Sequence, residues 1–203
     1  MPVITYDLNS EPIQYLIAKD QDLKQLFNAT GPVKYTRWRD AFHFMIYTVL
    51  SQQISLTVAD VMYGRMHQAV QGPLSPISLL KLSDDKLKSI GLSKAKTLYV
   101  KAVAQAALHG VFDEVLNTSM TDEAVKNRLL LIHGIGPWSV DMFMMFVLGH
   151  EDIFALGDLA LRKALAQFKG VDPFDRHTLK RITDRYKPYR SIIAHALWQL
   201  HEA

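Results

Sequence analysis

The sequence of 203 residues contains no cysteine. This absence excludes disulfides, thiol nucleophiles, cysteine-ligated zinc sites and iron–sulfur clusters. Long apolar runs are also absent, because the longest, residues 142–148, is too short to cross a bilayer. The first residues have neither the basic nor the apolar segment of a signal peptide. We therefore expect a cytoplasmic protein and no membrane partner.

Neither sign of charge dominates the composition as a whole. Apolar residues make up 49% and charged residues 21%, which is typical of soluble globular chains and unlike disordered ones. The length suits one domain, or two small ones, with a sizeable buried core.

The net charge of +3 is unevenly distributed. Residues 160–190 contain nine basic residues and three acidic ones, so this stretch carries +6 and the rest of the chain −3. The nine are Arg162, Lys163, Lys169, Arg176, Lys180, Arg181, Arg185, Lys187 and Arg190. Such asymmetry indicates a polyanionic partner, since Lys and Arg neutralise the phosphates of nucleic acids. The alternative is the solvated face of a C-terminal helix.

Hydrophobic spacing predicts helices along almost the entire chain. Residues 42–50 repeat apolar side chains every three or four positions, as a helix with one buried face does. Ser and Thr are favourable N-caps, and they precede four expected helices at Ser55, Ser83, Ser93 and Thr121. Only residues 1–8 alternate apolar and polar side chains as a strand does. We predict an all-α fold of about ten helices, without internal repeats or a flexible linker.

Residues 132–139 hold the most informative local pattern, Ile-His-Gly-Ile-Gly-Pro-Trp-Ser. Gly134 and Gly136 permit a positive φ and the close approach of another molecule, and Pro137 suits the first turn of a helix. The helix that follows should end at Gly149. A helix N-terminus behind glycines offers amide donors to an anion, such as a DNA phosphate. The alternative is an ordinary turn between two helices.

Four blocks of the sequence occur together, in order, from about residue 35 onward. They are residues 50–55 (Leu-Ser-Gln-Gln-Ile-Ser), the hairpin through Trp138, residues 152–161 (Asp-Ile-Phe-Ala-Leu-Gly-Asp-Leu-Ala-Leu), and residues 189–191 (Tyr-Arg-Ser) with Trp198. As a set they resemble the helix-hairpin-helix DNA glycosylases, specifically the branch typified by DNA-3-methyladenine glycosylase II. The resemblance implies a helix-hairpin-helix glycosylase fold, in which two helical subdomains flank a cleft.

The resemblance also implies how the chain is divided. Residues 1–203 would form a single catalytic domain. The subdomain that contains the hairpin would span about 36–149, and the other about 1–35 plus 150–203. Asp158 and Trp138 would then face each other across the cleft.

Asp158 stands at the start of an apolar helix, directly after Gly157. Taken alone, it is a helix N-cap, since Asp is strongly preferred there. The resemblance implies that it is also catalytic, and the two roles are compatible because a helix N-terminus favours a carboxylate. Such an anion would stabilise the oxocarbenium-like charge at the sugar, and could orient or deprotonate water. The second carboxyl group that most glycosidases use is dispensable where the leaving purine is already cationic.

Trp138 occupies the position at which relatives resembling endonuclease III carry a Schiff-base lysine. A tryptophan cannot form an imine, so the resemblance implies a monofunctional enzyme that leaves an abasic site. Trp138 and Trp198 match aromatic base-pocket residues of the branch, whose rings suit a cationic base. The alternative is that both rings fill the core. Met142 replaces a tyrosine of the best-known relative, which leaves the base selectivity open.

The resemblance also implies contacts to DNA. Gln53 would insert into the duplex gap left by the flipped nucleotide, although taken alone such a side chain is solvated or bonded to local backbone. Gln52 is interpreted as structural. The hairpin residues expected to bind DNA are His133, Gly134, Ile135 and Gly136. A Na or K ion would lie on the backbone carbonyls of Leu130, Ile132 and Ile135. We expect no other cofactor, no iron–sulfur cluster and no required metal.

The resemblance therefore implies a monofunctional DNA glycosylase of base excision repair, associated with the nucleoid if the protein is bacterial. It would flip alkylated purines, such as 3-methyladenine, out of double-stranded DNA with damaged bases and hydrolyse the glycosidic bond, acting as a monomer. One alternative is a non-catalytic helix-hairpin-helix DNA-binding protein, against which Asp158 and the two tryptophans argue. A third is an all-α interaction protein, against which the hairpin and the local charge argue. The choice among 3-methyladenine, 7-methylguanine, ethenoadenine and hypoxanthine stays open.

Overall fold

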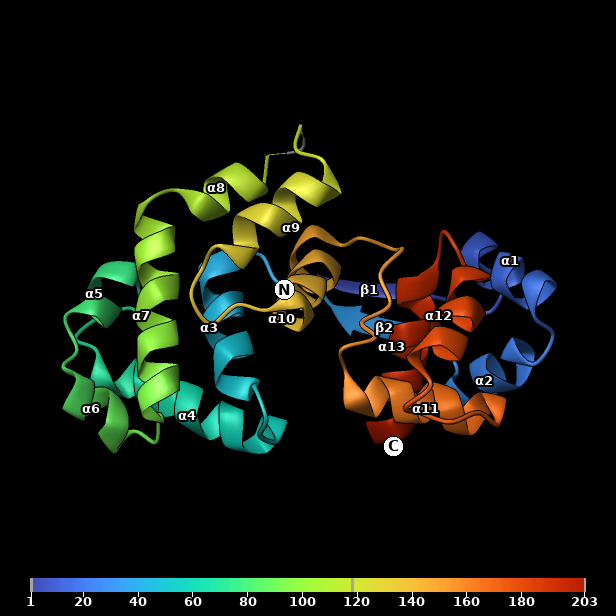
Figure 1. The fold of residues 1–203 in the computed structure, drawn as a ribbon, viewed down its shortest axis with the longest axis horizontal. Coiled ribbons are helices and arrows are strands. Elements are labelled where there is room, and N and C mark those ends of the chain that lie inside the picture. Colours follow the sequence, from blue (N-terminus) through green and yellow to red (C-terminus); the bar gives the residue numbers. More distant parts are fainter. Residues whose placement is uncertain (1, 118, 203) are drawn as a thin grey trace. The chain divides into compact units, whose positions relative to one another are not determined.

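Thirteen α-helices, one π-helix and two short strands make up the part of the chain that the structure, a computed structural model, describes (Figure 1). The described residues are 2–117 and 119–202. The all-α prediction is confirmed, whereas the expected number of about ten helices is wrong because several helices are only five or six residues long. No helix among these residues is both long and apolar enough to cross a membrane.

The chain divides into two units. The first comprises Met1–Arg39 with Met144–Ala203, and the second is the continuous segment Asp40–Phe143. The corresponding boundaries predicted from the sequence are at about residues 36 and 149.

The second unit is built around one central helix, α3. Its elements are α3 (Ala41–Ser51), α4 (Leu56–Ala69), α5 (Pro76–Leu80), α6 (Asp84–Ser89), α7 (Lys94–Leu108), α8 (Val111–Val115), α9 (Asp122–Leu130) and α10 (Pro137–Phe143). Helix α3 packs against α4, α7 and α10, and α7 also packs against α5 (Figure 1). The apolar face expected for α3 is confirmed, because Phe42, Met45, Ile46 and Val49 are all buried.

Helix starts in this unit follow the predicted caps. Each capping side-chain oxygen accepts the backbone amide three residues further on, which satisfies a donor that the helix leaves unpaired. The pairs are Ser55 with Val58, Ser83 with Lys86, Ser93 with Lys96, and Thr121 with Ala124. Local chemistry therefore fixes where these helices begin.

The first unit combines both ends of the described chain. Its elements are β1 (Val3–Tyr6), α1 (Glu11–Lys19), α2 (Leu23–Thr30), β2 (Val33–Thr36), η1 (Met144–Leu148), α11 (Leu159–Lys169), α12 (Arg176–Asp184) and α13 (Arg190–Glu202). The strands pair antiparallel, and α13 packs against α2, β2 and α11. Strand β1 matches the alternation noted in residues 1–8, whereas β2 was not predicted.

A buried polar contact ties the two ends together. The carboxylate of Asp20 accepts a hydrogen bond from the hydroxyl of Tyr186 (2.6 Å) and pairs with the ammonium of Lys169 (2.7 Å). Asp20 is only 9% exposed, and burial opposes its charge. The bonds from Lys169 and Tyr186 outweigh that effect, so the pKa of Asp20 lies below its usual value.

The segment after α10 departs from a regular α-helix. Helix α10 is followed directly by the π-helix η1, and Gly149, with φ +76°, comes next, so the predicted helix end is confirmed. The guanidinium of Arg37 donates to the carbonyls of Val147 (3.1 Å) and Leu148 (2.7 Å). A Cβ added to Gly149 would lie 2.7 Å from Cζ of Arg37. Arg37 therefore satisfies the last carbonyls of η1 only because residue 149 is glycine.

Candidate functional site

The hairpin turn between α9 and α10 is tightly packed in the second unit. The amide of Ile135 donates to the carbonyl of Ile132 (3.0 Å), and both side chains are buried. Gly134 has φ +88°, and an added Cβ would lie 2.1 Å from Cγ of Tyr99. Glycine is therefore required at this position. Gly136 differs, because its φ is not positive and a Cβ there would meet open space.

Two amides of the turn are available to a ligand. Within the described part of the chain, neither the amide of Gly134 nor that of Gly136 donates a hydrogen bond. His133 between the buried isoleucines is exposed, and its ring contacts the ring of Tyr99 edge-on at 5.1 Å. Unpaired backbone donors close to an exposed imidazole suit an anionic group such as a phosphate.

Three backbone carbonyls of the turn, those of Leu130, Ile132 and Ile135, each have a lone pair available for the alkali ion that the resemblance implies. The Ile132 carbonyl already accepts the Ile135 amide, and a carbonyl oxygen has a second lone pair. The carbonyls of Leu130 and Ile135 accept no hydrogen bond among residues 2–117 and 119–202. Hard cations prefer oxygen ligands of this kind. No cluster of His, Asp and Glu that could hold a metal occurs among the same residues.

The break between α3 and α4 is bonded to the hairpin. The side-chain amide of Gln52 donates to the carbonyl of Gly134 (3.1 Å) and to the hydroxyl of Ser139 (3.3 Å), so its structural role is confirmed. The ammonium of Lys96 donates to the carbonyl of Leu50 at the end of α3. These contacts hold both flanks of Gln53, which is exposed and has φ +60°.

Trp138 lies in the first turn of α10 and is half-buried. Ser139, which follows it, is buried and bonded to Gln52. Met142 is only 6% exposed and therefore contributes to the packing of the second unit. The second unit thus contains Trp138, Gln53 and the hairpin, whereas Asp158 and Trp198 belong to the first. The cleft expected between them stays a prediction.

Asp158 is the N-cap of α11, as the sequence predicts. Its carboxylate oxygen Oδ1 accepts the amide of Leu161 (2.8 Å), and its own amide donates to the carbonyl of Ala155 (2.8 Å). The residue is half-buried. Both the backbone and the carboxylate of Asp158 are therefore fixed in place by local hydrogen bonds.

Trp198 belongs to an aromatic cluster of the first unit. Its ring lies 6.0 Å from that of Phe146 and 5.7 Å from that of His195, which stacks on Tyr35 at 4.0 Å. Burial lowers the pKa of His195 to about 3, so this ring is neutral near pH 7. Phe146, His195 and Tyr35 were not predicted from the sequence as neighbours of Trp198. Only His195 could have been suspected, because it precedes Trp198 by three residues on one helix.

The structure corrects the interpretation of the basic stretch. Most of its charged groups are bonded inside the first unit: Lys169 to Asp20 and Asp22, Lys180 and Lys187 to Asp184, Arg190 to Asp152, and Arg185 to the carbonyl of Lys19. Three of these carboxylates lie outside residues 160–190. The positive charge left for a partner is therefore smaller than the sequence suggests, although Lys163, Arg176 and Arg181 are exposed.

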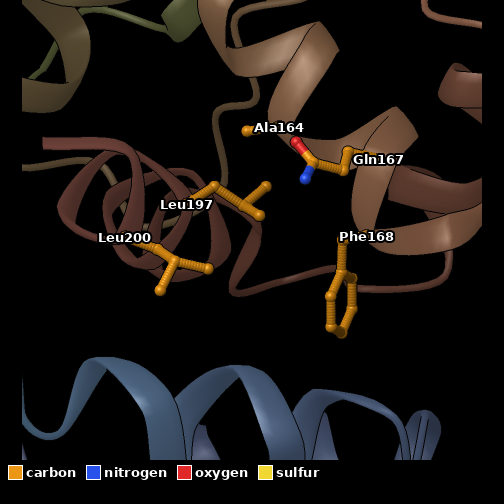
Figure 2. Close-up of a pocket in the computed structure, with 5 residues that line it drawn as sticks. All are labelled: Ala164, Gln167, Phe168, Leu197 and Leu200. Carbon is orange, nitrogen blue, oxygen red and sulfur yellow. The ribbon is translucent and has the colours of Figure 1, made fainter. Parts of the chain in front are cut away.

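One pocket of about 510 Å³ lies in the first unit between α11 and α13. Figure 2 shows Ala164, Gln167 and Phe168 of α11 on one side and Leu197 and Leu200 of α13 on the other. None of these five is a predicted site residue, so the pocket does not coincide with the site expected from the sequence.

Comparisons with known proteins agree with the fold and the hairpin. DNA-3-methyladenine glycosylase 1 of Schizosaccharomyces pombe is 24% identical over 194 residues, 91% of this chain and 84% of that protein. The probable bifunctional transcriptional activator/DNA repair enzyme AlkA of Mycobacterium tuberculosis (strain CDC 1551 / Oshkosh) is 26% identical over 205 residues, which cover 97% of this chain. The chain spans only 40% of the length of that second relative.

A solved structure is similar over nearly the whole chain. The crystal structure of DNA-3-methyladenine glycosidase from Bacillus halodurans superposes with a TM-score of 0.82 and 29% sequence identity, covering 96% of this chain and 91% of that one. A family model for the HhH-GPD superfamily base excision DNA repair protein matches residues 46–188, more than two thirds of the sequence. These residues include Gln53, the hairpin with Trp138, and Asp158. The chain therefore belongs to the HhH-GPD superfamily of base excision DNA repair proteins.

Proposed function

We propose that this protein is a monofunctional DNA glycosylase that excises alkylated purines, such as 3-methyladenine, from double-stranded DNA. The observation that carries the proposal is the fixed, half-buried carboxylate of Asp158, in a chain whose hairpin has unpaired amides at Gly134 and Gly136. Relatives named DNA-3-methyladenine glycosylase and glycosidase, similar over more than nine tenths of the chain, support it.

DNA would be held mainly through its phosphate backbone. The free amides of Gly134 and Gly136 would donate to one phosphate, with His133 beside them. An alkali ion on the carbonyls of Leu130, Ile132 and Ile135 would add positive charge at the same place. The exposed side chain of Gln53 would fill the gap that the flipped nucleotide leaves.

The chemistry would depend on a carboxylate that is oriented before the substrate arrives. The Leu161 amide holds one oxygen of Asp158, so little reorganisation is needed when positive charge develops at the sugar. As the bond between the sugar and the base breaks, both electrons leave with the purine, and the carboxylate stabilises the oxocarbenium-like sugar. Asp158 would also orient the water that adds to the sugar and accept the proton that this water releases. An alkylated purine is cationic and departs as a neutral base, so no general acid is required.

The base itself would stack on aromatic rings. Trp138 and Trp198 are both half-buried. The electron-rich face of an indole attracts a cationic base. Neither residue has an amine, so an imine with the sugar cannot form at these positions, and the strand should stay intact.

The test is base release from duplexes that each contain 3-methyladenine, 7-methylguanine, ethenoadenine or hypoxanthine. We expect release of at least one alkylated purine, an abasic product, and no adduct after borohydride treatment. Duplex binding without release of any of these bases would instead favour a non-catalytic DNA-binding protein, and a trapped adduct would contradict the monofunctional assignment.

Asp158→Asn separates catalysis from capping. Asn caps almost as well as Asp, so the free energy of unfolding should change by only a few tenths of a kcal/mol. Excision should slow by about a hundredfold to a thousandfold, because the charge that faces the sugar is lost. Asp175→Asn is the matched control, since Asp175 caps α12 through the amide of Thr178 (3.0 Å) in the same unit. Excision at the wild-type rate by Asp158→Asn would show that Asp158 is only a cap.

A further inference from the structure

Arg162, in the first turn of α11, is a buried cation without an anion. The residue is 8% exposed, and its Nε is fully enclosed without a hydrogen-bond partner. Among residues 2–117 and 119–202, no hydrogen bond or ion pair reaches any nitrogen of this guanidinium. A guanidinium stays protonated in proteins. The fold therefore holds a positively charged group that no acceptor of the described chain contacts directly.

The two half-buried arginines of the same unit are satisfied. Arg37 donates to two backbone carbonyls at the end of η1, and Arg190 pairs with the carboxylate of Asp152 at 2.7 Å. Burial of a charge without a partner is costly, and replacing such a charge by an apolar side chain of similar volume is often neutral or stabilising. Arg162 is thus a poor choice for stability, which points to a partner that the chain itself does not supply.

The position of Arg162 suggests what that partner is. Arg162 lies one turn after Asp158 at the start of α11, where its backbone amide donates to the carbonyl of Asp158 (3.1 Å). Among the described residues no ion pair joins the Arg162 guanidinium to a carboxylate, and Oδ1 of Asp158 accepts the Leu161 amide. Nε is the only nitrogen of this guanidinium that is both fully enclosed and without a hydrogen-bond partner. The two terminal amino groups also have no hydrogen-bond partner, but they retain access to solvent.

We propose that Arg162 binds one phosphodiester group of the damaged strand, next to the nucleotide whose sugar meets Asp158. This inference rests on the proposed function. The planar guanidinium can donate two parallel hydrogen bonds to two phosphate oxygens, which a lysine cannot do. The bound phosphate also neutralises a positive charge that would otherwise oppose the cation developing at the sugar.

The experiment compares Arg162→Met, Arg162→Lys and the control Lys163→Met, whose neighbouring side chain is exposed on the same helix. Thermal unfolding is measured without DNA, and affinity for a lesion-free duplex is measured across a salt series. For Arg162→Met we expect an unchanged or higher unfolding temperature, together with roughly tenfold to hundredfold weaker binding. Its slope of log K against log salt should fall by about 0.9, the value for one lost phosphate contact. Arg162→Lys should keep the slope but bind more weakly than wild type, and Lys163→Met should weaken binding less than Arg162→Met.

Each outcome decides the matter. A lower unfolding temperature for Arg162→Met would show that the guanidinium has a structural partner, and an unchanged affinity and slope would show that it does not contact DNA. Either result overturns the inference. Inorganic phosphate is a second probe: stabilisation of wild type but not of Arg162→Met, with equal DNA affinity, would mean that Arg162 binds a free anion instead. If wild type binds duplex but releases no base, the proposed function fails while the contact of Arg162 with phosphate is still measured.

Discussion

Gly134→Ala should be among the most damaging single-methyl additions in the hairpin. The backbone at this position has φ +88°, a conformation that costs an L-residue about 1–2 kcal/mol relative to glycine. The new Cβ would also lie 2.1 Å from Cγ, 2.3 Å from Cδ1 and 2.7 Å from Cβ of Tyr99. These atoms are at the base of the ring, so a rotation of the ring cannot remove all three clashes. Overpacking of this kind costs about 1–3 kcal/mol.

The expected loss is therefore about 2–5 kcal/mol in the free energy of unfolding, measured by urea denaturation with circular dichroism. Gly136→Ala is the matched control two residues away, because its φ is ordinary and its Cβ meets nothing within 4 Å. It should be neutral or stabilising by up to about 1 kcal/mol, since alanine restricts the unfolded chain. Adding Tyr99→Ala to Gly134→Ala should relieve the clash but not the backbone strain. Equal stability of the two glycine variants would show that neither the contact with Tyr99 nor the positive φ at Gly134 restricts the side chain at this position.

Two further predictions concern strain and protonation. Gln53→Gly should raise the free energy of unfolding by up to about 1 kcal/mol, because φ +60° strains a residue with a side chain. The same variant should release bases more slowly if Gln53 fills the duplex gap. Urea denaturation and the excision assay measure both effects, and a variant that is less stable would contradict the first. Burial lowers the pKa of His195 from 6.5 to about 3, so an unfolded chain binds a proton below pH 6.5 that the folded ring does not. Stability from this group is present above pH 6.5 and lost as the pH falls, by about 1.4 kcal/mol per pH unit. His195→Leu should remove that part of the slope between pH 6 and 4, and unchanged slopes would show that His195 titrates normally.

Features that depend on neighbouring residues could be predicted from the sequence. The caps at Ser55 and Asp158 bind amides only three residues away, so residue type and position were enough. The helical segment formed by α10 and η1 ends at Gly149. This end was also predictable, because glycine readily adopts the positive φ found there. The structural role predicted for Gln52 is confirmed, since its side chain donates to the carbonyl of Gly134. The DNA contact expected of Gln53 stays a prediction.

Features that depend on distant partners could not be predicted. Strand β2 is defined by its pairing with β1, from which two helices separate it in the chain. The charge of residues 160–190 looked free because Asp20 and Asp152, which neutralise part of it, lie elsewhere in the sequence. The unpaired state of Arg162 could not be predicted for the converse reason, since only the folded structure shows that no carboxylate of the described residues forms an ion pair with it.

The way the chain is divided has a consequence for the order of folding. The second unit is one continuous segment, so all of its internal contacts can form once Phe143 has been synthesised. The first unit requires pairs that are far apart in sequence, such as Tyr15 with Lys187 and Tyr6 with Glu151. Distant contacts form slowly because a long loop must close first. The second unit, which contains the hairpin, should therefore fold during translation. The N-terminal strand and helices can pack only after α13 has been synthesised, and until then their apolar faces are exposed to solvent or bound by chaperones.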